Sequence, residues 1–218
     1  PLITHRFGFN KAVEVYEKMN AGSLEGMGLL FKYTAKPSDK RKKPTFNAIE
    51  KSKKTIGIGC IGAGAYASSM LLPHLKSHQK TRMEAVANAT PLSAKNAEDK
   101  FGFTHSGTDY NAWIKNKVID AIIIGTRHAS HPHFVCEGLN AGKAVFVEKP
   151  LSVDRAGMQK IQKTIKKTKN NRLHVGFNRR FSPIMQKIKS MLDGAPLAMH
   201  YRVHAGHLDQ SSWTHDKE

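Results

Sequence analysis

The chain has only two cysteines, Cys60 and Cys136, among its 218 residues. Two thiols are too few for a disulfide framework or for a cysteine-rich zinc site, which excludes the small stapled classes of protein. Both lie in apolar segments, where a free cysteine behaves as a small core residue. This usage fits a reducing compartment, and we expect a cytoplasmic protein.

Long hydrophobic runs are also missing. No stretch approaches the roughly 18 consecutive apolar residues that mark a membrane-spanning helix, so we expect no membrane partner. The sequence starts at Pro1 rather than Met and shows no secretory signal pattern. We therefore expect a fragment or a processed chain.

Acidic residues are scarce. The chain has 17 Asp and Glu against 35 Lys and Arg, a formal net charge of +18. Such a field attracts polyanions and also anionic cofactors. Zinc-finger spacing and an RNA-binding aromatic motif are both absent, and the lysines are dispersed or gathered in linker-like runs. A solvated basic surface is the better interpretation, and nucleic acid is not an expected partner.

The most informative segment that is present runs from residue 55 to residue 67. A buried-strand pattern leads directly into a turn of the form Gly-x-Gly-x-x-Ala, and apolar residues at helical spacing follow. Strand, tight turn and helix start form the context of a dinucleotide-binding fingerprint. The helix N-terminus then faces the phosphates. The expected cofactor is NAD or NADP, and the expected contacts are Gly62, Gly64, Ala65, Tyr66 and Ala67.

Strand and helix patterns alternate from residue 55 onward. The β-branched and aromatic runs at 122–124 and 145–147 are typical of strands buried on both faces, which indicates a parallel sheet. The predicted fold class is α/β, a doubly wound Rossmann parallel sheet followed by the start of a second domain. Strands are expected at 55–61, 83–87, 121–125, 144–148, 174–177 and 197–203, and helices at 67–76, 91–101, 109–116, 132–141, 153–169 and 182–192.

Composition divides the chain into four parts. Residues 1–35 are expected to form a tail with one helix, capped by Asn10, and one strand at 27–33, too little to bury a core. Prolines and lysine runs indicate a basic linker at 36–54. Residues 55–178 are the predicted dinucleotide-binding domain, and 179–218 the predicted start of a second domain.

Polar residues follow the strands where each ends. Ligands of open parallel sheets bind beyond the carboxyl ends of the strands, so we expect these residues to share one site. Asn88 occupies the place of the acid that binds the ribose hydroxyls of NAD; being neutral, it permits NADP, or it only shapes the turn. The candidates at these ends are Asn88, Thr90, Thr126, Arg127, His128, His131, Glu148, Lys149, Pro150, Asn178 and Arg179.

Lys149 is the catalytic candidate, because a lysine at the mouth of an apolar pocket can orient a substrate hydroxyl or move a proton. The alternative is an ordinary surface lysine at a strand end. The nearby His128, His131 and His133 have no carboxylate or cysteine to complete a ligand set, so no metal site is predicted. His131 is expected to form hydrogen bonds near the cofactor or to cap a helix.

Together the segments 61–67, 126–131, 141–151 and 176–181 resemble the glucose-fructose oxidoreductase / inositol dehydrogenase (Gfo/Idh/MocA) family. The Glu148-Lys149-Pro150 run is the most specific part of a resemblance that covers residues 54–218. It implies an NAD(P)-binding Rossmann domain, then an α+β domain that forms the substrate site and often the oligomer interface. It also implies that Lys149 contacts substrate and nicotinamide, with a cis bond to Pro150. Sugars, cyclitols or sugar nucleotides would exchange a hydride at a hydroxyl-bearing carbon.

Residues 1–35 instead resemble the C-terminal tail of zinc-type medium-chain alcohol dehydrogenases, on the opening segment 1–7 and the helix that ends at 16–19. The whole then resembles a bi-domain oxidoreductase of bacterial polysaccharide clusters. The family's catalytic Asp/His motif is not found before Glu218, so we expect truncation at both ends and, from exposed half-domain surface, a homo-oligomer. An NAD(P)-dependent oxidoreductase is the first hypothesis; a non-catalytic dinucleotide-binding or scaffold fragment is the alternative.

Overall fold

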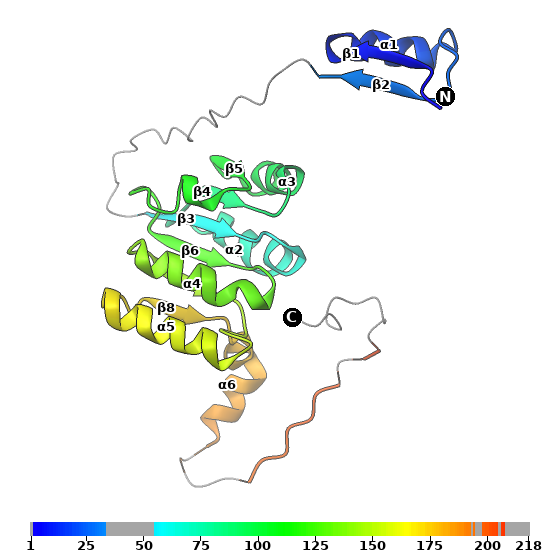
Figure 1. Ribbon diagram of the computed structural model, residues 1–218. Helices are drawn as coiled ribbons and strands as arrows, with labels where there is room; N and C mark the ends of the chain where they lie inside the picture. Colours follow the sequence, from blue (N-terminus) through cyan, green and yellow to red (C-terminus); the bar gives the residue numbers. More distant parts are fainter. Residues whose placement is uncertain (1, 34–54, 193, 195–197, 205, 208–218) are drawn as a thin grey trace. The chain divides into compact units, whose positions relative to one another are not determined.

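The computed structural model describes residues 2–33, 55–192, 194, 198–204 and 206–207 (Figure 1). These residues belong to two compact units, one on each side of the segment 34–54. The predicted basic linker lies outside the described residues. So does most of the segment after residue 204.

The first unit consists of two short parallel strands and one helix. Strand β1 (His5–Gly8) pairs with β2 (Leu29–Lys32), and a 3-10 turn, η1 (Phe9–Lys11), leads into α1 (Ala12–Asn20). The predicted cap at Asn10 is wrong, because that residue lies inside the 3-10 turn and Lys11 precedes the helix. Strand β1 was not predicted, since its four residues show no apolar alternation.

Aromatic contacts hold this first unit together. The ring of Phe31 lies 5.9 Å from that of Tyr16 and 6.4 Å from that of Phe9, which stacks on Tyr33 at 4.5 Å. Val15 is the one buried residue of α1. The described part of this unit therefore has a surface cluster rather than an enclosed core, as a single two-stranded layer must.

The second unit is a six-stranded parallel sheet with the strand order β5-β4-β3-β6-β7-β8. The chain runs outward from β3 to β5, returns to place β6 on the other side of β3, and continues to β8. The point between β3 and β6 is thus a topological switch point, where open α/β sheets bind their ligands. The strands are β3 (Ile56–Ile61), β4 (Thr81–Ala87), β5 (His105–Gly107), β6 (Ala121–Ile124), β7 (Ala144–Val147) and β8 (Leu173–Val175).

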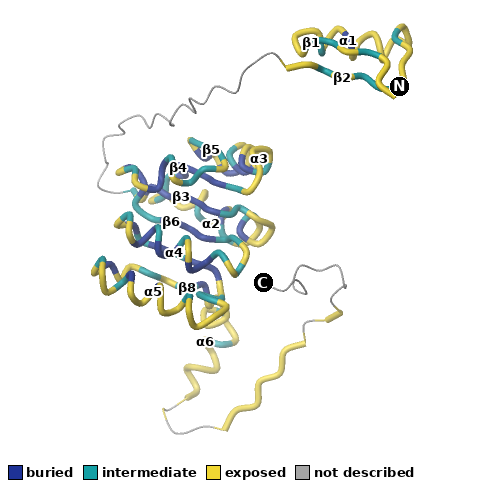
Figure 2. Tube along the Cα trace, in the orientation of Figure 1, coloured by how far each residue is buried: buried dark blue, intermediate teal, exposed yellow. Residues whose placement is uncertain are grey.

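Helices cover both faces of this sheet, and its central strands are largely buried (Figure 2). Ile122 and Ile124 of β6 belong to a core with α4 (His131–Asn140) and α5 (Arg155–Thr168), while Ile123 belongs to a core with α2 (Leu72–Ser77) and α3 (Pro91–Phe101). Alternate residues of one strand thus pack into the cores on opposite faces of the sheet, as the continuous apolar runs predicted. The doubly wound α/β fold is confirmed.

The first helix of the sheet domain has an irregular start. A π-helical turn, η2 (Ala67–Leu71), comes first, and Leu72 N donates to Ala67 O, five residues back. Pro73 lacks an N–H and cannot continue the ordinary ladder from the preceding turn. A single α-helix over 67–76 was therefore too simple a prediction.

Two further helix predictions need correction. Residues 109–116 contain only a 3-10 turn, η3 (Tyr110–Ala112), because the following Trp113 is buried against β3, where a Cβ on Gly59 would lie 2.5 Å from its ring. Helix α5 begins after Asp154, whose side chain accepts from Gly157 N at 2.6 Å, and not at residue 153 as predicted. By contrast, α3 begins at Pro91 as predicted, and Thr90 caps it.

The last described elements follow β8. A 3-10 turn, η5 (Asn178–Phe181), precedes α6 (Pro183–Ser190), which falls within the predicted helix at 182–192. The predicted strand at 197–203 is wrong for its described residues, 198–203, which form no regular structure. A strand needs a hydrogen-bonded neighbour, and none of the described strands lies beside this segment.

Candidate functional site

The carboxyl ends of β3, β4, β6 and β7 surround a cleft of about 800 Å³. Its position at the switch point follows from the strand order, because the glycine turn after β3 lies next to the loop after β6. Eleven of the predicted residues line this cleft: Gly62, Gly64, Ala65, Tyr66, Asn88, Thr126, Arg127, His128, His131, Glu148 and Lys149.

The glycine turn packs on the end of β6 more closely than side chains would allow. Gly62 has a φ of +85°, and a Cβ there would lie 2.6 Å from Thr126 Cγ2 and 2.8 Å from its backbone N. A Cβ on Gly125 would lie 3.0 Å from that of Ala67. These positions thus need small residues for the protein's own packing.

Gly64 is different. It lines the cleft, yet a Cβ there would meet only the carbonyl oxygen of Gly125, at 3.9 Å. Packing within the protein therefore does not require glycine at this position. The open space beside its Cα faces the cleft, where a ligand can approach the backbone closely.

The helix that follows begins at this turn. Ser68 N donates to Gly64 O at 2.9 Å, which is the first helical hydrogen bond, and Ser68 Oγ donates to Ala63 O at 3.0 Å. The N–H groups of the first turn have no acceptor inside a helix. They give the glycine turn a partial positive charge that suits an anion.

Asn88 holds the glycine turn from the end of β4. Its Oδ1 accepts from Ala63 N at 2.7 Å, and its Nδ2 donates to Ser93 O at 2.9 Å. Thr90 is occupied as the cap of α3, where its hydroxyl accepts from Ser93 N at 3.2 Å. Both side chains therefore have structural roles, which was one of the two interpretations of Asn88.

His131 joins the loops that follow β6 and β7. Its ring is fully buried, with Nδ1 2.7 Å from Pro150 O and Nε2 3.1 Å from Thr126 O. It is the first residue of α4, after Ser130, so it forms hydrogen bonds as predicted but does not cap the helix. The bond from Lys149 to Pro150 is cis, as the family resemblance implied.

The side chain of Glu148 is buried, whereas the next residue, Lys149, is exposed. Glu148 is 7% exposed, its Oε2 accepts from Lys149 N at 3.3 Å, and its Oε1 is buried with no hydrogen-bond partner. Burial raises the pKa of this carboxyl above its ordinary value, and the nearby Lys149 and His131 only partly offset the effect. A Cβ on Gly176 would lie 2.7 Å from Oε1, so glycine is needed there.

The structure does not bring every predicted residue to the cleft wall. Ala67 packs beneath the turn, Pro150 turns its carbonyl to His131, and Thr90 and Arg179 lie outside the lining. Asn178 reaches the glycine turn from beyond β8, where its Nδ2 donates to Tyr66 Oη at 2.6 Å. Ala63, Ala89, Ser93 and Gly125 line the cleft but were not predicted as site residues. Ser93 had a signal, since it lies one helical turn after Thr90.

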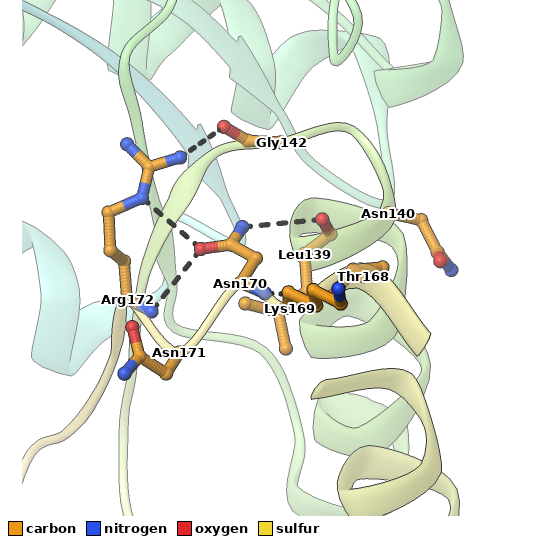
Figure 3. Close-up of a pocket in the computed structure, with 8 residues that line it drawn as sticks. All are labelled: Leu139, Asn140, Gly142, Thr168, Lys169, Asn170, Asn171 and Arg172. Atoms are coloured by element: carbon orange, nitrogen blue, oxygen red, sulfur yellow. Dashed lines mark hydrogen bonds between the residues drawn. The ribbon is translucent and has the colours of Figure 1, made fainter. Parts of the chain in front are cut away.

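A second hollow, of about 520 Å³, lies between the ends of α4 and α5 and the start of β8 (Figure 3). Asn170 Nδ2 donates to Lys143 O at 2.9 Å and to Leu139 O at 3.3 Å, and its Oδ1 accepts from Arg172 Nε at 3.2 Å. Arg172 also donates to Gly142 O at 2.6 Å. Figure 3 shows the hydrogen bonds that join Asn170 and Arg172 to Leu139 and Gly142, so this hollow is a structural clasp between the end of α4 and the start of β8.

The described ranges contain no group of three His, Cys, Asp or Glu side chains placed to hold a metal ion. None of the helices there is long and apolar enough to cross a membrane.

A parallel sheet in this order, with a glycine turn at its switch point, defines a Rossmann-type dinucleotide-binding domain. The chain belongs to the Gfo/Idh/MocA family, described as the oxidoreductase family with an NAD-binding Rossmann fold. That family matches residues 56–177, more than half of the chain.

Similar proteins of known activity include inositol dehydrogenases. Inositol 2-dehydrogenase of Salmonella typhimurium (strain LT2) is 27% identical over 159 residues, which cover 72% of this chain and 47% of the relative. Inositol 2-dehydrogenase/D-chiro-inositol 3-dehydrogenase of Lactiplantibacillus plantarum is 30% identical over 150 residues, 66% of this chain and 43% of the relative. The chain thus spans less than half the length of the curated relatives it matches.

Solved structures of the same family superpose on the sheet domain. KijD10, a 3-ketoreductase from Actinomadura kijaniata in complex with TDP-benzene and NADP, has a TM-score of 0.58 and 27% identity, covering 64% of this chain and 43% of that one. Apo scyllo-inositol dehydrogenase from Lactobacillus casei has a TM-score of 0.59 and 27% identity, covering 63% and 41%.

Proposed function

We propose that this chain binds NAD or NADP and serves an oxidoreductase that transfers a hydride to or from a hydroxyl-bearing carbon of a sugar, cyclitol or sugar nucleotide. One observation carries the proposal: the glycine turn and Lys149 line the same cleft. The activities of the relatives, inositol dehydrogenase and 3-ketoreductase, support the substrate class.

The described residues fit a dinucleotide. Gly64 leaves open space that the protein does not fill, and the first-turn N–H groups after it suit a pyrophosphate. The predicted contacts after β6, from Thr126 to His128, line the same cleft as the turn. When bound, the nicotinamide supplies or accepts the hydride.

Lys149 is the proposed catalytic residue. Its side chain is exposed at the cleft beside the sealed Glu148, so its Nζ is free to turn toward a substrate. Oxidation of an alcohol releases a proton from the hydroxyl oxygen along with the hydride. In this proposal Lys149 orients that hydroxyl and, as the neutral amine, takes up the proton to become an ammonium, which returns the proton when a ketone is reduced.

We also propose the finer organisation that the sequence indicated: a tail at 1–35 related to medium-chain alcohol dehydrogenases, a linker at 36–54, a dinucleotide domain at 55–178 and the start of a substrate domain at 179–218. The exposed aromatic cluster of the first unit supports its packing on another domain. Exposed apolar residues of α6, such as Ile184, support self-association. The unpaired, buried Cys60 and Cys136 support a reducing compartment, the cytoplasm.

Titration with NADH and NADPH, followed by nicotinamide fluorescence, tests the proposal. We expect saturable binding, and Gly64→Ala is expected to weaken it by about tenfold, because the new Cβ enters the space that the ligand needs. The matched control is Gly107→Ala, where a Cβ would have nothing within 4 Å. No binding of either dinucleotide at millimolar concentration would sink the proposal. Binding without turnover of any polyol or sugar would favour the non-catalytic alternative.

A further inference from the structure

The side-chain oxygen and nitrogen of Asn88 both form hydrogen bonds within the protein. Its oxygen accepts from the glycine turn, at Ala63 N, and its nitrogen donates to α3, at Ser93 O. These two partners also fix the orientation of the amide, because an N–H faces its oxygen and a carbonyl faces its nitrogen. Asn88 is therefore a strut that links the turn to the helix, with one hydrogen bond at each of its two polar atoms.

Asn88 occupies the position at which dinucleotide-binding folds distinguish NAD from NADP. It directly follows the second strand of the fold, β4, beside the glycine turn. An acid at this place binds the ribose hydroxyls of NAD and repels the 2′-phosphate of NADP. The neutral amide of Asn88 has no charge to repel a 2′-phosphate, and its hydrogen bonds to Ala63 and Ser93 hold it between the turn and the helix.

No other acid takes over that role among the described residues of the cleft wall. Glu148 is the single carboxylic acid in the lining, and it lies at the end of β7 with its pKa raised by burial. The residues that flank Asn88 in the lining are Ala89 and Ser93, both uncharged. The cleft is thus electrically neutral at the end of β4.

The charge of the whole chain works in the same direction. A formal net charge of +18 draws anions toward the protein, and a 2′-phosphate makes NADP more anionic than NAD. Arg127 adds a cationic side chain to the same cleft. Neither the charges near Asn88 nor the net charge of the chain therefore opposes binding of a 2′-phosphate.

We propose that the cleft admits the 2′-phosphate, so that NADPH binds at least as tightly as NADH, and that Asn88 sets this specificity by being a neutral strut instead of an acid. The inference rests on the proposed dinucleotide binding. It goes further by naming the residue that fixes the choice between the two cofactors.

The first experiment compares the dissociation constants of NADH and NADPH at one fixed ionic strength. We expect NADPH to bind at least as tightly as NADH. Binding of NADH that is tighter by about tenfold or more would overturn the inference while leaving the proposed function intact. Binding of neither would overturn the proposed function and this inference with it.

A pair of variants tests the place of selection. Ala89→Asp adds a carboxylate to the cleft wall beside Asn88 without touching the strut, and Ala89→Asn is its uncharged match. We expect Ala89→Asp to weaken NADPH by about tenfold or more and NADH by less than about threefold, because only NADPH carries the 2′-phosphate. Ala89→Asn should leave the ratio of the two constants unchanged. Equal weakening of both dinucleotides by Ala89→Asp would overturn the inference.

Asn88→Asp addresses the strut itself. The carboxylate keeps an acceptor for Ala63 N but turns its second oxygen toward the carbonyl of Ser93, where the native amide donates. We expect a lower midpoint of thermal unfolding, together with a shift of preference toward NADH. An unchanged midpoint and an unchanged preference would show that Asn88 has neither role.

Discussion

Asn178 donates a 2.6 Å hydrogen bond from its Nδ2 to the hydroxyl of Tyr66, although 112 residues separate the two. Asn178 opens the turn η5 after β8, and Tyr66 stands at the start of the helix that follows the glycine turn. The bond ties the last strand of the sheet to the turn beside the first, across the carboxyl edge. The sixth strand thus supports the candidate cofactor site without lining it.

Removal of this tie is expected to cost little stability. Tyr66→Phe and Asn178→Ala should each lower the free energy of unfolding by about 0.5–1 kcal/mol, since the bond is exposed and water can replace it. The double variant should cost less than the sum, because both changes remove the same bond. Urea denaturation of all four proteins measures this coupling, with Tyr201→Phe at an exposed site as the control. Strict additivity would show that the bond contributes nothing.

Gly62 and Gly102 form a natural pair for a second prediction. Both have positive φ, +85° and +75°, but a Cβ on Gly102 would meet nothing within 4 Å, whereas one on Gly62 would meet Thr126 at 2.6 Å. Alanine at 102 should cost about 1 kcal/mol for its backbone conformation alone. Alanine at 62 should cost about 2 kcal/mol more, since backbone atoms must also move. Equal losses in chemical denaturation would show that the turn is loose.

The sequence was most informative where the signal is local. The glycine turn and the cap at Thr90 with Pro91 are determined by the few residues around them, and both appear in the structure. Continuous apolar runs predicted a parallel sheet for the same reason. The strand order then placed the predicted strand ends around one cleft.

What the sequence did not predict depends on partners far along the chain. The amide of Asn88 meets Ala63, and Asn178 meets Tyr66, and no pattern in either segment announces its partner. The helix expected at 109–116 failed likewise, because Trp113 packs over β3 and breaks the helical path. Strand β5, with three residues, is too short for an apolar pattern to identify it.

The clasp of Asn170 supports a third prediction. Its buried amide bonds to Leu139, Lys143 and Arg172, so alanine there leaves two carbonyls and a guanidinium without their partner. We expect Asn170→Ala to lower the free energy of unfolding by about 2–3 kcal/mol. Asn171→Ala, at the exposed neighbouring position in the same hollow, should change it by less than about 0.5 kcal/mol. A similar small effect at both positions in urea denaturation would contradict the clasp.

Glu148 predicts an unusual pH dependence of stability. Because burial raises the pKa of this carboxyl in the folded state, the folded protein binds its proton more strongly than the unfolded chain does. Its contribution to stability is thus fully present below the pKa of the unfolded state, about 4.3 for glutamate. It is lost as pH rises through the higher pKa of the folded state. Glu148→Gln keeps the shape and removes the titration. The variant should therefore be more stable than the native protein at neutral pH, and the difference should shrink on acidification.

Glu98 supplies the opposite sign as a control. Its hydrogen bonds from Lys95 and Ser106 hold the pKa of this carboxyl below its ordinary value, so its contribution is present at neutral pH and lost as pH falls. Glu98→Gln should therefore be less stable than the native protein at neutral pH, with a difference that vanishes in acid. Unfolding free energies measured from about pH 2 to pH 8 for the three proteins decide the matter, because the Glu98 contribution is lost below the ordinary pKa of glutamate. A Glu148→Gln curve that runs parallel to the native one would show that this carboxyl is ordinary despite its burial.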